Sequence, residues 1–159
     1  MGAGSDEVSW LQDRPARLES AYAVTAGGLR PFRRWLHRGG WVEALLIAVE
    51  ELSKAEVFDC RMCGSCVLHS TGMTCPMTCP KTMRNGPCGG VQEDGRCEVL
   101  RDQPCTWVQA WRRAEHMPRY GSQIGLLLPP LDRRLQGGSA WIHDFEGIAT
   151  ETPAGWQRP

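Results

Sequence analysis

Eight cysteines are the residues in this sequence whose type and spacing suit chemistry, and all of them lie between Cys60 and Cys105. Cys60, Cys63 and Cys66 form a C-x2-C-x2-C run, a spacing that lets three thiolates reach three corners of one cubane iron–sulfur cluster. A structural zinc ion more often takes its ligands as separated pairs. The triplet therefore favours iron–sulfur over zinc.

The thiols that follow the triplet complete a set large enough for two sites. Cys75 and Cys79 each precede a proline, as in the C-P ending of ferredoxin-type ligand runs. Eight thiolates meet the requirement of two [4Fe-4S] clusters, and equally of one [4Fe-4S] cluster plus one zinc ion held by four cysteines. The candidate ligands are Cys60, Cys63, Cys66, Cys75, Cys79, Cys88, Cys97 and Cys105.

Spacing alone leaves the assignment of cysteines to sites open. As a working division, we expect the triplet to take its fourth ligand from Cys79 or Cys105 and the other thiols to form the second site. His69, the one histidine within the cysteine segment, is not expected to be a ligand.

Small and basic residues near the cysteines are candidates to tune bound clusters. Glycine has no Cβ, so backbone N–H groups near a glycine can approach cluster sulfurs. Turn formation explains each glycine of the cysteine segment equally well. Lys81 and Arg84 are candidates to offset the negative charge of a thiolate-ligated cluster, with a solvated position as the more common alternative. The candidate glycines are Gly64, Gly86, Gly89 and Gly90.

Charge and length narrow the classes of function. Lys+Arg and Asp+Glu both number 18 in 159 residues, so nothing global attracts the chain to nucleic acid or to an acidic membrane. The first residues have neither a basic n-region nor an apolar h-region, so we expect a cytoplasmic, reducing environment without disulfides. The longest apolar run, residues 41–49, is too short to span a bilayer. We therefore expect a protein partner, with neither nucleic acid nor a membrane.

The sequence pattern divides the chain into four segments. We expect an N-terminal arm over residues 1–28 with room for one short helix, because Gly27-Gly28 reads as a flexible break. A helical segment follows over 29–57, then a Cys-rich iron–sulfur core over 58–106, and then a helix and an extended partner-binding tail over 107–159.

Within these segments, apolar periodicity predicts helices over 41–54 and 106–116. The density of Gly and Pro between them predicts loops wrapped around metal, with at most a short hairpin over 92–99. The predicted fold class is a small α-dominated metal-binding domain, in which helices flank an irregular, Cys-rich cluster-binding core and an extended C-terminal tail follows.

Tryptophans and arginines mark the predicted faces of these elements. Trp41, Trp107 and Trp111 lie on apolar helical faces and are expected in the core. Trp141 and Trp156 lie in the predicted tail, where they are candidates to anchor a partner. We expect a solvated helix face for Arg30, Arg33, Arg34 and Arg38.

The run CRMCGSCVLHSTGMTCPMTCPKTMRNGPCGG, followed by GRCEV and PCTWVQAWRR, closely resembles the cysteine-rich C-terminal domain of bacterial methylenetetrahydrofolate reductases. In some members this domain is fused behind a flavin-containing barrel, and in others it is a separate small subunit. The tail PPLDRRLQGGSAWIHDFEG also resembles the family, so the resemblance covers about residues 42–147. It implies that the eight cysteines bind iron–sulfur clusters, with zinc as an alternative at one site. The loop VLHSTGM after the triplet departs from the more acidic or proline-containing stretch common in the family.

The resemblance implies an accessory subunit, because the chain lacks the barrel and so carries no motif for flavin or folate. We expect the subunit to dock on a flavoprotein methylenetetrahydrofolate reductase, with flavin only on that partner, and to relay electrons between the flavin and a ferredoxin-type donor. It is not expected to be catalytic alone. The alternative is a structural zinc or inert-cluster domain that stabilises the reductase assembly without electron transfer.

Overall fold

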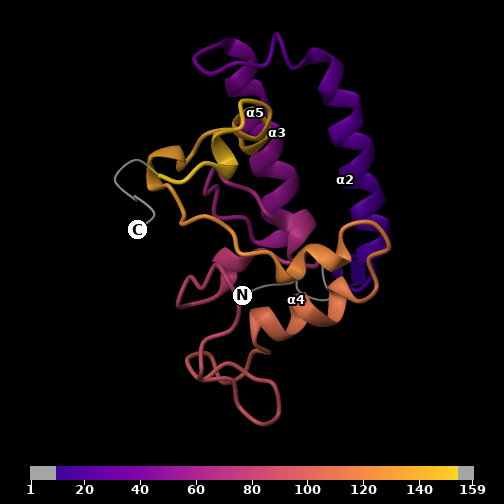
Figure 1. Ribbon diagram of the computed structural model, residues 1–159, viewed down its shortest axis with the longest axis vertical. Coiled ribbons are helices and arrows are strands. Elements are labelled where there is room, and N and C mark those ends of the chain that lie inside the picture. Colours follow the sequence, from indigo (N-terminus) through magenta and orange to yellow (C-terminus); the bar gives the residue numbers. More distant parts are fainter. Residues whose placement is uncertain (1–9, 154–159) are drawn as a thin grey trace.

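Helices surround an irregular centre in the computed structural model, which describes residues 10–153 (Figure 1). The α-helices are α2 (Pro15–Leu29), α3 (Trp41–Phe58), α4 (Thr106–Ala114) and α5 (Ala140–Phe145), joined by loops and short 3-10 turns. Strand pairing in this part of the chain is limited to isolated antiparallel bridges between Val91 and Cys97 and between Arg96 and Pro104. The helix-dominated fold and the rudimentary hairpin are therefore confirmed.

Helix α3 delivers the chain to the first cysteine. It begins after Gly40, and Glu43 in its first turn accepts a hydrogen bond from the N–H of Gly39 at 2.6 Å. It ends where Asp59 adopts the left-handed conformation, with φ 47°. The helix thus runs to Phe58, one turn beyond the predicted end at Lys54, and Cys60 follows its C-terminus directly.

Helix α2 occupies much of the segment that the sequence predicted to be an arm. Pro15 stands at the start of the helix, where its missing N–H costs nothing. The fully buried Glu19 accepts hydrogen bonds from the backbone N–H groups of Arg119 and Tyr120, at 3.0 and 2.7 Å. This tertiary anchor offsets the low helix propensity of Gly27-Gly28, which lie within α2 and form no break.

The buried apolar residues form small clusters that include cysteines. One cluster contains Leu68, Met73, Cys75 and Met117, with Tyr22 of α2 packed against it. A second contains Cys105, Trp107 and Ala110 of the α4 region. The cysteine segment is therefore part of the core, and α2 and α4 both contribute residues to the packing around it.

The C-terminal segment folds back over the cysteine triplet. The N–H of Gly137 donates to the carbonyl of Met62 at 2.8 Å, and the Gln136 amide donates to the carbonyl of Arg61 at 2.7 Å. The segment then forms α5, whose N-cap is Ser139. The predicted extended tail is thus replaced by short helical turns, and it covers the domain's own surface.

The tryptophans correct several expectations. Trp107 is 3% exposed and is confirmed as core, whereas Trp41 and Trp111 are 79% and 47% exposed, so their predicted burial is wrong. Trp141, the expected partner anchor, is buried and stacks on Tyr22 with ring centroids 5.0 Å apart. Trp156 lies outside the described residues.

The surface carries the expected arginines, since Arg30, Arg33, Arg34 and Arg38 are all exposed. No helix in the part of the chain that the structure describes is both long and apolar enough to cross a membrane.

Candidate metal centre

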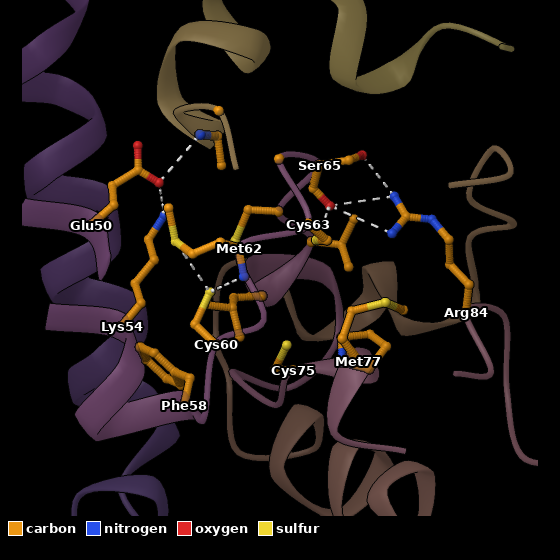
Figure 2. Close-up of a pocket in the computed structure, with 17 residues that line it drawn as sticks. Glu50, Lys54, Phe58, Cys60, Met62, Cys63, Ser65, Cys75, Met77 and Arg84 are labelled. Carbon is orange, nitrogen blue, oxygen red and sulfur yellow. Dashed lines mark hydrogen bonds and ion pairs between the residues drawn. The ribbon is translucent and has the colours of Figure 1, made fainter. Parts of the chain in front are cut away.

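The eight cysteines are free thiols and fall into two groups of four. Site 1 is a pocket lined by Cys60, Cys63, Cys66 and Cys75 (Figure 2). Site 2 is a separate pocket lined by Cys79, Cys88, Cys97 and Cys105. The structure therefore places Cys75 with the triplet, and this corrects the working division, which gave that place to Cys79 or Cys105.

A tight loop brings Cys75 back to the triplet. The buried Thr71 hydroxyl lies 2.9 Å from the carbonyl of Val67 and 2.7 Å from that of Thr74. The N–H of Met73 also donates to the carbonyl of Leu68 at 2.9 Å. These bonds close residues 67–74 into a compact turn. The turn brings Cys75, the next cysteine after the triplet, back to site 1 as its fourth thiol.

Gly64 allows the C-terminal segment to cover site 1. Its φ is +71°, and a Cβ at this position would lie 1.9 Å from the carbonyl oxygen of Leu135. The carbonyl of Gly64 is also 2.6 Å from Nδ1 of the buried His143 in α5. Only glycine allows the backbone of Leu135 to approach this closely at position 64.

Backbone N–H groups do reach the sulfurs of site 1, but they do not come from the predicted glycines. The N–H of Met62 donates to Cys60 Sγ at 3.4 Å. Burial raises the pKa of Cys66 and Cys75, and the backbone N–H groups of Leu68 and Met77 oppose that rise. In each case the donor lies two residues after the cysteine. Such bonds stabilise the thiolate and raise the reduction potential of a bound cluster.

Burial acts on the thiols in the opposite direction. Burial raises the pKa of Cys75 to about 12, although the Met77 N–H opposes the shift. Burial also raises the pKa of Cys66 and Cys60. Thiolates at site 1 therefore need cationic neighbours or a bound metal to be stable.

Arg84 is a cationic neighbour of this kind. It is 8% exposed, and its guanidinium donates to the carbonyl of Pro129 and to the hydroxyl of Ser65, both at 2.9 Å. None of the ion pairs among residues 10–153 includes Arg84. Burial lowers the pKa of Arg84, and the thiols of Cys63, Cys66 and Cys75 oppose that shift. A buried cation without a carboxylate is costly, so these thiols are its natural counter-charge.

Lys54 approaches site 1 from α3, on the side away from Arg84 (Figure 2). Its ammonium donates to Glu50 at 2.6 Å. Burial alone would lower the pKa of Lys54, but Cys66 and Glu50 raise it above its usual value. The other oxygen of Glu50 accepts a hydrogen bond from the hydroxyl of Ser139, at the N-terminus of α5. One buried ion pair therefore joins α3, α5 and site 1.

Site 2 is built around the start of α4 and the rudimentary hairpin. Cys105 precedes α4, and its N–H donates to the carbonyl of Gly95 at 2.9 Å. The N–H of Cys97 donates to the carbonyl of Gln103, also at 2.9 Å. Glu98, which the sequence reasoning missed, lies 3.8 Å from Cys88 Sγ and pairs with Lys81. Its position directly after Cys97 in the sequence could have identified it as a neighbour of the site.

The donor sets fit iron–sulfur clusters. Each site offers four thiols, which is the ligand set of a [4Fe-4S] cluster and also of structural zinc. Among residues 10–153, no three His, Cys, Asp or Glu side chains converge tightly enough to hold a single metal ion as they stand. The fit therefore rests on the number and type of the donors, and it admits either group at each site.

His69 and three of the four candidate glycines have other surroundings than the sulfurs of site 1. His69 stacks on Tyr22 with ring centroids 5.2 Å apart, and burial lowers its pKa. It lines neither site. The space beside Gly90 is filled by the Glu98 carboxylate, while Gly86 and Gly89 face open space. Turn formation is thus the simpler account of these last two glycines.

Comparison with protein families gives one match. The family model described as methylene-tetrahydrofolate reductase C terminal matches residues 41–133. The matched region contains α3, α4 and all eight cysteines, whereas α2 and α5 lie outside it. Searches of curated proteins and of solved structures gave no match.

Proposed function

The chain belongs to the methylene-tetrahydrofolate reductase C-terminal family, and we propose on that premise that it is an iron–sulfur electron-transfer subunit of such a reductase. Family membership associates the chain with a reductase partner. The proposal adds that the partner carries flavin, that a ferredoxin-type protein is the electron donor, and that this chain is not catalytic alone.

The division of the cysteines into two complete four-thiol sites is the observation that carries the proposal. Neither site leaves a thiol over, and all eight thiols lie in the part of the chain that matches the family. When bound, an iron–sulfur cluster supplies one-electron oxidation and reduction at iron. The free state of the thiols also supports a reducing, cytoplasmic location.

The residues of the chain have distinct roles in this proposal. The cysteines hold the clusters, and the N–H groups of Met62, Leu68 and Met77 orient and stabilise the thiolates of site 1. Lys54 and Arg84 offset negative charge at site 1, and Lys81 offsets the Glu98 carboxylate beside site 2. The folded-back C-terminal segment limits the access of water to site 1.

The alternative function is a structural domain that holds zinc or an inert cluster. Four-thiol sites of this kind can supply folding free energy without any redox role. The C-x2-C-x2-C spacing of Cys60, Cys63 and Cys66 favours a cluster over zinc at site 1.

Anaerobic stopped-flow mixing distinguishes the two functions. The dithionite-reduced chain, freed of excess dithionite, is mixed with the oxidised reductase, and flavin absorbance is followed. Electron transfer predicts flavin bleaching together with reoxidation of the chain. A complex that forms without any flavin reduction would instead support the structural domain.

A further inference from the structure

Helix α3 has two opposite faces, and the outer one has no partner in the described structure. Glu50 and Lys54 lie on the inner face, toward site 1 (Figure 2). At about 100° per residue, positions 41, 45, 48, 52 and 55 fall on the side opposite Glu50. We call these residues the α3 seam; they are Trp41, Leu45, Ala48, Leu52 and Ala55.

The α3 seam is both apolar and solvent-exposed. Trp41, Leu45 and Leu52 are 79%, 56% and 74% exposed, and Ala48 and Ala55 are exposed as well. Val49, beside the seam, is 54% exposed. A continuous apolar row along more than three turns of a helix is a mark of an interaction surface, whereas single exposed apolar residues are ordinary.

The spacing of the seam specifies a helix as its occupant. The steps of 4, 3, 4 and 3 residues between seam positions follow the heptad pattern that packs one helix against another. Alanine at positions 48 and 55 allows the axes to approach closely, and Trp41 offers a large anchor at one end.

Charge on the borders of the seam decides between a second copy and a different protein. The charged residues at the flanking heptad positions are Glu51 and Glu56, and both are exposed. A second copy would place carboxylates against carboxylates along the same seam. A helix with Lys or Arg at its flanking positions is complementary instead.

We propose that the α3 seam binds an amphipathic, basic-flanked helix on the surface of the reductase polypeptide. This inference rests on the proposed function, which supplies the reductase as partner. The family match begins at Trp41, the first residue of both α3 and the seam, so the seam belongs to the part of the chain that the family shares. A partner bound there lies about one helix diameter from site 1, roughly 10 Å. Docking and electron exchange would therefore use the two faces of one helix.

Calorimetric titration with the reductase tests the seam. The double variant Leu45→Glu/Leu52→Glu places charges in the apolar row, and its matched control is Leu127→Glu, at a residue that is 87% exposed and outside the seam. We expect at least a hundredfold weaker binding for the double variant, since two charges replace two leucines that the partner would bury, and no more than a twofold change for the control. Iron content and helical circular dichroism should match the unsubstituted chain, because neither substitution touches the cysteines.

The outcomes separate this inference from the proposed function. If the reductase binds the double variant as tightly as the unsubstituted chain, the seam assignment is wrong and the accessory function stands. If the chain alone forms a dimer that the double variant abolishes, the occupant is a second copy, which overturns the inference. If the unsubstituted chain does not bind the reductase at all, both the inference and the proposed function fail.

Discussion

At the scale of single residues, the number and spacing of the cysteines were enough to identify all eight as candidate ligands. The partition between sites was not visible in the sequence, because it depends on the turn that Thr71 closes between Cys66 and Cys75. Arg84 was likewise a candidate by its position, but only the fold shows that it is buried without a carboxylate partner. Burial of a polar residue results from packing between distant segments, so local sequence does not report it.

The partition predicts that the two sites can be removed independently. Cys75→Ser should eliminate the cluster of site 1 and leave that of site 2, whereas Cys97→Ser should do the reverse. Iron analysis with electron paramagnetic resonance of the reduced proteins measures this. Each variant should retain about half of the iron, with different residual spectra. Identical residual spectra would contradict the partition.

Arg84 is predicted to raise the reduction potential of site 1. Reduction adds negative charge to the cluster, and the Arg84→Met variant lacks the buried cation that stabilises this charge. The variant should therefore lower the midpoint reduction potential of site 1 by at least about 60 mV, which corresponds to a tenfold change in the one-electron equilibrium. The matched control is Arg61→Met, since Arg61 forms an exposed ion pair with Asp59. An optical redox titration measures both. Equal midpoints for Arg84→Met and the control would show that the guanidinium has only a structural role.

The positions of the main helices were predicted better than their buried sides, because apolar periodicity locates a helix without showing which side is buried. Residues 41–54 and 106–116 were expected to be helical, and α3 and α4 confirm this. The apolar side of α3, which the sequence pattern would place in the core, is nevertheless the exposed α3 seam. The side that faces site 1 consists of Glu50, Lys54 and half-buried apolar residues. Helix α2 is longer than the short helix expected within the N-terminal arm, because contacts with residues 119 and 120 stabilise it from a hundred residues away.

Contact between α3 and α5 is predicted to depend on Glu50. The buried carboxylate pairs with Lys54, and it accepts hydrogen bonds from the Ser139 hydroxyl and from the N–H groups of Ala140 and Trp141. Glu50→Ala should lower the free energy of unfolding by about 3 kcal/mol, since it removes the carboxylate that pairs with Lys54 and leaves the buried donors of Ser139, Ala140 and Trp141 without their acceptor. Chemical denaturation of the metal-loaded chain measures the change.

The neighbouring Glu51 provides the control for this element. It is exposed on the same helix, so Glu51→Ala should change the free energy of unfolding by no more than about 0.5 kcal/mol. Equal effects of the two substitutions would mean that the Glu50 network contributes nothing beyond helix propensity.

At the scale of the whole molecule, two cysteine sites take the place of a large apolar core. The buried apolar clusters are small, and both include cysteines from the sites. Much of the stability of residues 60–105 should therefore come from bound metal. The helices and the folded-back C-terminal segment form a shell around site 1, and α3 offers its outer face to a partner.

The metal content of the anaerobically purified chain tests the central claim most directly. Iron, sulfide and zinc are measured per polypeptide, with the visible spectrum recorded before and after dithionite. Two [4Fe-4S] clusters predict about eight irons and eight sulfides, little zinc, and a broad absorbance that bleaches reversibly. A colourless protein with zinc and no sulfide would contradict the account and assign both sites a structural role.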